Sequence, residues 1–206
     1  MKKNMLFWSL LCALVFGFGS SAMAQSKALQ KDIKKRVKQL EKEGWKLQAS
    51  TQTLTYAVTK YRTYLEEDPE NRIEIVGVAE GINEKTRDNA VANGVSNYAS
   101  RAAVQVIGKL KTLFAQDAAA GQEIDKFGSA YEIGVNTRIK ALVKQHFILV
   151  KTEKDGKKLF NAFLSIDESQ ARKAREEAAR DAAEKAKLTD LSEKVKEFIG
   201  EPVPAE

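Results

Sequence analysis

The chain has 206 residues, of which 34 are basic and 28 acidic, giving a net charge of +6 at neutral pH. A hydrophobic content of 43% excludes disorder throughout, and this length favours one domain with a buried core over two ordinary domains. The single cysteine and the single histidine exclude disulfides within the chain, cysteine-ligated metal centres and most histidine-based catalytic sets.

The first 24 residues have the three parts of a secretory signal peptide. Lys2 and Lys3 form a positive start, residues 6–18 are apolar, and Ala22-Met23-Ala24 has the small-x-small pattern of a cleavage site. The apolar run is shorter than the ~20 residues of a membrane-spanning helix. Cys12 lies inside this run, upstream of the cleavage site, so lipid attachment is not expected.

Cleavage at this site would leave residues 25–206. Because the removed segment holds two lysines and no acid, the mature chain has 182 residues and a net charge of +4. We therefore expect a protein that is exported to the periplasm or associated with the outer membrane.

Helical spacing dominates the start of the mature chain. Residues 27–43 place apolar side chains every three or four positions, and Gly44 followed by Trp45 is typical of a helix C-terminal cap. Residues 53–67 contain the Thr, Tyr and Val typical of strands, but their three-four spacing predicts a second helix. Asp68-Pro69-Glu70-Asn71 then has the composition of a turn.

A strand and two long helices are predicted next. Residues 73–81 form a β-branched run that ends at Gly81, and Gly77 inside it marks either a bulge or a close contact with a helix. Helical patterns follow at residues 84–116 and 123–145. Small residues along the first of these favour close packing against a sheet or another helix: Ala90, Gly94, Ala99 and Ala103.

Two strand-like runs, residues 147–152 and 158–166, are joined by residues 153–157. Asp155-Gly156 in this connection predicts a hairpin with a primed turn, in which both residues have positive φ. Phe163 and Leu164 are adjacent, so they must point to opposite faces of the sheet.

The last helical pattern, residues 167–198, is rich in alanine and charge. Its apolar line offers little to bury, so we expect a peripheral, solvent-exposed helix in which Ala178→Asp has little effect. Opposite charges at i,i+4 spacing support such a helix. These pairs are Arg172 with Glu176, Arg180 with Glu184, and Asp181 with Lys185.

These elements predict an α+β fold: a small antiparallel sheet, made of one strand and a distal hairpin, covered by two long helices, with amphipathic N- and C-terminal helices. Two core helices cover only one face of the sheet. Either the terminal helices return to the other face or a second subunit covers it, and we expect association. The predicted regions are a signal peptide (1–24), an N-terminal helical region (25–67), an α+β core module (70–167), a C-terminal charged helix (168–199) and a tail (200–206).

The core module carries a family resemblance. The strand Val76-Gly77-Val78-Ala79-Glu80-Gly81, a long helix beginning at Arg87-Asp88-Asn89-Ala90 and the distal aromatic hairpin resemble small bacterial surface lipoproteins of the Helicobacter type over residues 70–167. The same module is similar to the N-terminal domain of the flagellar ring-assembly protein, and residues 40–45 resemble uncharacterised exported proteins of gut Bacteroidetes. The resemblance implies an α+β module of envelope assemblies, with no known enzymatic activity and no cofactor. This chain lacks the lipobox of the lipoproteins.

The sequence predicts no catalytic, cofactor-binding or metal-ligating set. His146 is expected to be a capping or half-buried structural residue, because a catalytic histidine needs an orienting carboxylate and a nucleophile, and only Asp88 is a candidate partner. The acidic residues at 66–71 lack the spacing and the glycine of a calcium loop. Residues 76–81 lack the spacing of a phosphate-binding turn, and Ser129 falls within a helical pattern instead of a strained turn.

The function that these features favour is binding or assembly in the envelope, without enzymatic activity, through surface aromatic and hairpin residues. The partner is a second copy or another envelope protein, and no nucleic acid is expected in this compartment. A basic excess between Lys31 and Lys42 makes contact with anionic lipid or glycan an option, although its mixed charges favour a solvated face. The alternatives are a small carrier of an apolar ligand held between the sheet and the helices and, least favoured, a hydrolase.

Overall fold

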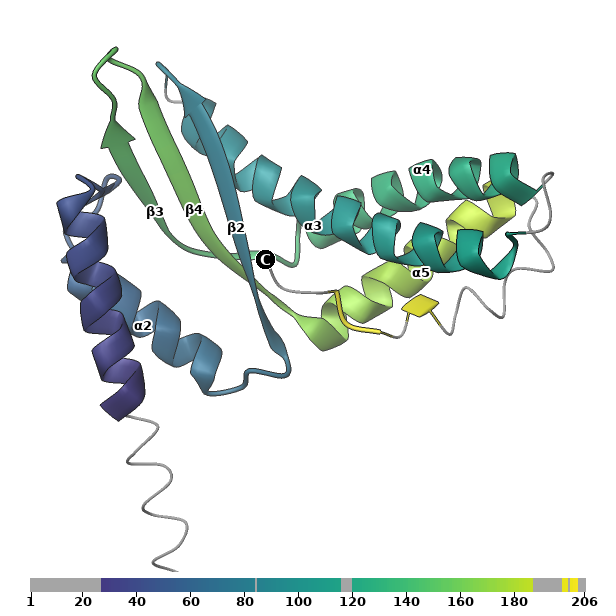
Figure 1. Cartoon of the computed structure of the whole chain (residues 1–206), viewed down its shortest axis with the longest axis horizontal. Helices are drawn as coiled ribbons and strands as arrows, with labels where there is room; N and C mark the ends of the chain where they lie inside the picture. The colour runs from purple at the N-terminus through teal and green to yellow at the C-terminus, as the bar shows by residue number, and fades with distance from the viewer. Residues whose placement is uncertain (1–26, 84, 116–119, 187–197, 200, 204–206) are drawn as a thin grey trace, which may run out of the picture.

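The computed structural model describes residues 27–83, 85–115, 120–186, 198–199 and 201–203 (Figure 1). The strands form one antiparallel sheet in the order β1-β3-β4-β2. The predicted α+β class is confirmed, including a sheet built from one strand and a distal hairpin. In chain order the elements are a helix at residues 27–42, β1 (Lys46–Leu47), α2 (Leu54–Glu66), β2 (Arg72–Gly81), α3 (Lys85–Leu113), α4 (Ala120–Ile139), β3 (Lys144–Thr152), β4 (Lys158–Asp167) and α5 (Glu168–Ala186).

Some predictions concern residues outside those that the structure describes. They are the signal peptide and its cleavage site, and the part of the C-terminal helical pattern beyond residue 186. Within the described part of the chain, no helix is long and apolar enough to cross a bilayer.

The N-terminal region contains the helix cap and the second helix that the sequence predicts. Gly44 has a φ of +85°, its N–H donates to Glu41 O (3.1 Å), and the N–H of Trp45 donates to Leu40 O (3.0 Å), which is the bonding of a Schellman cap. The side chain of Thr53 accepts a hydrogen bond from the N–H of Tyr56 and so begins α2. The predicted cap and the second helix are therefore confirmed.

The hairpin between β3 and β4 is confirmed, but the predicted primed turn is wrong. Gly156 has a φ of +86°, whereas Asp155 is not among the described residues with positive φ. The carboxylate of Asp155 instead accepts from the N–H of Lys157 (3.1 Å), and the N–H of Glu153 donates to Lys157 O (2.8 Å). A five-residue connection needs one left-handed residue only, and glycine supplies it.

The junction before β3 also differs from the sequence prediction. α4 ends at Ile139, whose carbonyl accepts from the N–H groups of Leu142 and Val143, and β3 begins at Lys144. The register of β3 on β4 is irregular between Gln145 and Phe147. This irregularity interrupts the alternation of side chains and hides the start of the strand in the sequence.

Gly77 is the point where α3 lies closest to the sheet. A Cβ at Gly77 would lie 1.9 Å from Ala90 O and 2.6 Å from Gly94 N. The β2–β4 register runs without interruption through Gly77, so the close helix contact, and not the bulge, is the correct alternative. α3 extends past the sheet, where α4 packs on it and on α5 (Figure 1). The second long helix thus joins the fold mainly through α3 and α5.

The other face of the sheet is covered by the N-terminal helix and α2 (Figure 1). Ile33, Val37 and Tyr61 from these helices pack with Leu149 and Phe163 of the sheet. Leu164, adjacent to Phe163, belongs to the core on the α3 side, as the alternation predicts. The face that we expected a second subunit to cover is therefore covered within the chain.

α5 is not the peripheral helix that the sequence suggested. Its alanines are buried against the rest of the core, and a Cβ at Gly134 of α4 would lie 3.0 Å from the Cβ of Ala178. Small side chains on both helices let the two backbones approach closely, and dense packing replaces large apolar area. The burial of Ala178 argues against the expected tolerance of Ala178→Asp. The buried alanines are Ala171, Ala174, Ala178, Ala179 and Ala182.

Candidate interaction site

The outer edge of β2 is the best candidate for an interaction site. β2 is ten residues long and stands at the end of the sheet order. Within the described residues it pairs with β4 on one side, and no strand pairs with its other side. An edge of this length presents backbone donors and acceptors that another strand can use.

The side chains of β2 alternate between the two faces of the sheet. Ile75 and Ala79 are buried toward α3, whereas Val78, on the opposite face, is 50% exposed. Ile82, directly after the strand, is 78% exposed. The side-chain amide of Asn93 on α3 donates to Val78 O (2.8 Å), so this backbone acceptor of β2 is already engaged. Exposed aliphatic side chains thus lie along and just beyond the strand.

Opposite charges stand near the two ends of β2. Arg72 donates to the carbonyl of Tyr64 and pairs with Glu67 at 2.7 Å, and the hydrogen bond to Glu67 raises the pKa of Arg72. Glu80 pairs with Lys157 of the hairpin at 3.0 Å. Both pairs are partly exposed, so either charge can also face a second chain.

His146 lies in β3 and is half-buried, as predicted. Its Nε2 and Ser165 Oγ share a hydrogen bond of 2.8 Å, and its ring lies 4.7 Å from that of Tyr61 and 4.8 Å from that of Tyr64. Burial, with the positive charges of Lys144 and Lys60, lowers the pKa of His146 to about 4. The imidazole is therefore neutral at pH 7 and acts as a packed polar residue.

Asp88, the carboxylate considered as a partner for His146, pairs instead with Arg87 at 2.9 Å. The acids at 66–71 are also engaged locally. Glu67 pairs with Arg72, and Asp68 accepts from the side-chain amide of Asn71 at 3.0 Å. In the part of the chain that the structure describes, no three acidic, histidine or cysteine side chains gather into a metal-binding group.

The other motifs considered in the sequence lie within helices and strands of the fold. Residues 76–81 lie inside β2 and pair continuously with β4, so they form no turn. The hydroxyl of Ser129 donates to Asp125 O within α4 (3.1 Å). The lysines between Lys31 and Lys42 are exposed along the N-terminal helix, opposite its buried apolar side chains. Asp181, expected to pair along α5, lies 2.5 Å from Arg138 of α4.

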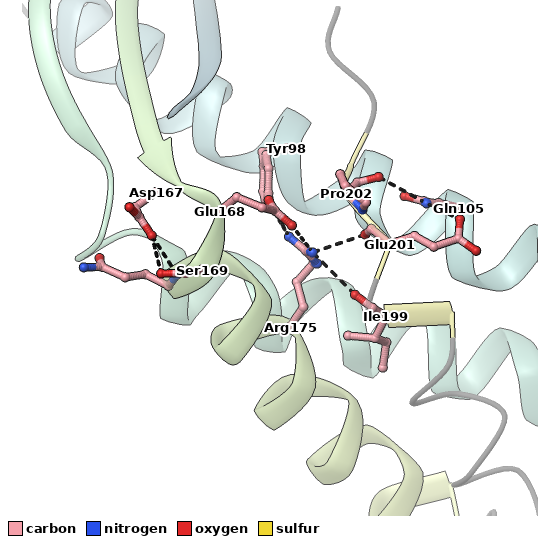
Figure 2. Close-up of polar contacts among 10 residues, drawn as sticks. Tyr98, Gln105, Asp167, Glu168, Ser169, Arg175, Ile199, Glu201 and Pro202 are labelled. Carbon is pink, nitrogen blue, oxygen red and sulfur yellow. Dashed lines mark hydrogen bonds and ion pairs between the residues drawn. The ribbon is translucent and has the colours of Figure 1, made fainter. Parts of the chain in front are cut away.

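Sequence reasoning missed a buried polar cluster between α3 and α5 (Figure 2). Arg175 Nη2 lies 2.6 Å from Glu168 Oε1, and Arg175 Nη1 donates to the hydroxyl of Tyr98 (2.5 Å). Burial acts to lower the pKa of Arg175, but Glu168 and Tyr98 raise it overall. Burial raises the pKa of Tyr98 to about 12. The available signal was the seven-residue spacing, which places Glu168 and Arg175 on the face of the buried alanines.

Comparison with known proteins gives no relative: the chain matches no protein-family model, no curated protein and no solved structure. Its function must therefore be inferred from its own residues.

Proposed function

We propose that this chain is an exported, non-enzymatic envelope protein that acts by assembly, and that the outer edge of β2 pairs with β2 of a second copy. The observation that carries the proposal is a ten-residue strand at the edge of the sheet with an exposed Val78 and opposite charges near its ends. An edge strand of this kind joins two copies through backbone hydrogen bonds.

Export is supported by residues 1–24, with their basic start, apolar run and Ala22-Met23-Ala24. The family resemblance of residues 70–167 favours an envelope assembly as well. The test is the mass of the protein recovered from the periplasm of a Gram-negative host. We expect Gln25 at its N-terminus, whereas an intact Met1 or a lipid on Cys12 would contradict export by signal cleavage.

The charges on β2 favour one register for the pairing. A two-fold axis perpendicular to the sheet relates the two β2 strands as an antiparallel pair. Residues that lie opposite each other then point to the same face of the sheet, so the axis passes beside a residue near the middle of the strand. With the axis at Val76, Arg72 of each copy lies opposite Glu80 of the other. With the axis at Gly77, Glu74 lies opposite Glu80, and like charges directly opposite each other are destabilising. We therefore assign the axis to Val76.

The environment of His146 supports a function without catalysis. The imidazole has a lowered pKa, and its ring packs between Tyr61 and Tyr64. The close approach of Gly77 to Ala90 favours assembly over the carrier, because it leaves no room for a ligand between β2 and α3 at that point.

Sedimentation of the exported protein over about a hundredfold range of concentration tests the assembly. We expect a concentration-dependent dimer. Val78→Glu should shift the protein to monomer, because with the axis at Val76 it places a glutamate opposite Glu74 of the other copy. Ile133→Glu is the matched control, since Ile133 is 68% exposed on α4, away from β2. A strict monomer, or a dimer that Val78→Glu leaves unchanged, would contradict the proposal.

A further inference from the structure

The C-terminal segment of the chain lies on a surface built by α3 and α5 (Figure 2). Ile199 and Val203 are only 2% and 4% exposed and belong to the main core cluster. Glu201 and Pro202, between them, are exposed and make polar contacts. The segment thus places two aliphatic side chains into the core, four positions apart, with the exposed Glu201 and Pro202 between them.

The segment is recognised mainly through its backbone. Arg175 Nη2 donates to Ile199 O (3.4 Å) and to Glu201 O (3.2 Å). The side-chain amide of Gln105 donates to Pro202 O (3.3 Å) and also lies 3.5 Å from the Glu201 carboxylate. Lys109 forms an ion pair with the same carboxylate. We call the residues that make or support these contacts the tail site: Tyr98, Gln105, Lys109, Glu168 and Arg175.

The core of the tail site is held in place by contacts that do not involve the segment. Glu168 accepts from both terminal nitrogens of Arg175 (2.6 and 3.3 Å), and the hydroxyl of Tyr98 accepts from Nη1 (2.5 Å). The contacts of Arg175 to the segment, at 3.2 and 3.4 Å, are longer than its shortest contacts to Glu168 (2.6 Å) and Tyr98 (2.5 Å). The guanidinium is therefore oriented by α3 and α5 and presents its remaining donors to the segment.

A buried ion pair is an inefficient way to stabilise a core. Removing two charges from water costs much of what their attraction returns, and apolar residues of similar volume often serve stability as well or better. A fixed guanidinium that faces backbone carbonyls does supply something that apolar residues cannot, namely directional recognition of the backbone of a bound segment.

We propose that the tail site is a binding site for a peptide with the pattern Ile-x-Glu-Pro-Val, and that Ile199 and residues 201–203 are its resident occupant, which a partner segment of the same pattern can replace. This site lies apart from the edge of β2, and the inference does not depend on the pairing of two copies. The tethered segment competes at an effective concentration in the millimolar range, so a partner segment binds well only when the segment is loosened.

The probe is a fluorescent peptide with the sequence of residues 196–206, and its binding to the full exported chain is followed by anisotropy. Glu201→Lys in the chain loosens the resident segment by placing a lysine against Lys109, while the peptide keeps its glutamate. We expect this variant to bind the peptide at least about fivefold more tightly than the unmodified chain. The resident segment loses one partly exposed ion pair, and the introduced lysine is repelled by Lys109. Val203→Ser, which removes an apolar contact of the segment, should act in the same direction.

A second substitution should restore binding of the resident segment to the tail site. Lys109→Glu added to Glu201→Lys restores an ion pair within the chain and opposes the glutamate of the peptide, so peptide binding should fall to the level of the unmodified chain. Lys111→Glu is the matched control, since Lys111 lies on α3 but pairs with Asp125. Circular dichroism confirms that each variant is folded. The inference is overturned if neither Glu201→Lys nor Val203→Ser increases binding, or if Lys109→Glu and Lys111→Glu act alike.

Discussion

The guanidinium of Arg175 and the carboxylate of Glu168 form an ion pair whose side chains are only 1% and 4% exposed, with Nη2 and Oε1 2.6 Å apart. Both residues belong to α5, two helical turns apart, and both face α3. The pair lies on the buried face of a helix that has few large apolar side chains. Its charged residues at these two positions are directed inward together with the alanines.

The first prediction concerns this pair. Arg175→Met should lower the free energy of unfolding by about 3–5 kcal/mol, because it leaves the Glu168 carboxylate buried without its partner. Adding Glu168→Leu should recover most of this loss, since neither charge then remains in the core. Urea unfolding followed by circular dichroism measures both. A double variant that is as unstable as the sum of the two single variants would contradict this account of the pair.

The second prediction tests the burial of α5. Ala178 is fully buried and close to Gly134, so Ala178→Asp introduces an unpaired charge where there is no room for it. The free energy of unfolding should fall by more than about 2 kcal/mol. Lys173→Asp, on the exposed side of the same helix, should change it by less than about 0.5 kcal/mol. Equal effects of the two substitutions would show that α5 is not packed as described.

The third prediction compares two glycines. Gly77→Ala would place its Cβ 1.9 Å from Ala90 O, so either the backbone of β2 or that of α3 must move, and the protein should lose more than about 1 kcal/mol. A Cβ at Gly108, in the same long helix, meets nothing within 4 Å. Gly108→Ala should therefore stabilise the protein by about 0.5–1 kcal/mol through its effect on helix propensity. Thermal melting of the two variants should show shifts of opposite sign.

The sequence was sufficient for those parts of the fold that have long, regular patterns. The helices at 27–42 and α2, the long helix α3 and the strands β2 and β4 follow from apolar spacing, because burial of one face determines both the element and its orientation. The cap at Gly44 and the close contact at Gly77 could also be predicted from the sequence. Gly44 has a positive φ, and a side chain at Gly77 would collide with α3.

The remaining features depend on tertiary contacts. β1 has two residues and exists only because it pairs with β3, so its sequence carries no pattern of its own. The burial of α5 follows from a close approach to Gly134, which alanine content alone does not reveal. The tail site combines residues of α3, α5 and the C-terminal segment, and no local spacing connects these three parts.

The fourth prediction concerns pH. The pKa of His146 is about 4 in the folded protein, below its ordinary value of 6.5, so the unfolded chain binds the proton more readily. The contribution of this residue to stability is therefore complete above pH 6.5 and is lost as the pH falls from 6.5 toward 4. Urea unfolding between these pH values should show a decrease that His146→Gln reduces. An NMR titration of the ring that gives an ordinary pKa would contradict the buried environment between Tyr61 and Tyr64.

The last prediction tests the register of the proposed β2 pairing. With the axis at Val76, Glu80→Arg alone places arginines opposite each other in a dimer, and Arg72→Glu alone places glutamates opposite each other, so each variant should dimerise more weakly than the unmodified chain. A mixture of the two has opposite charges at both positions and should form heterodimers in preference to either homodimer. Sedimentation of the mixture, with one variant labelled, measures this preference, and melting curves of each variant alone check that the fold survives the loss of the Arg72–Glu67 pair. Because the axis at Gly77 would leave Arg72 and Glu80 apart, a mixture that behaves as the average of its components would reject the assigned register.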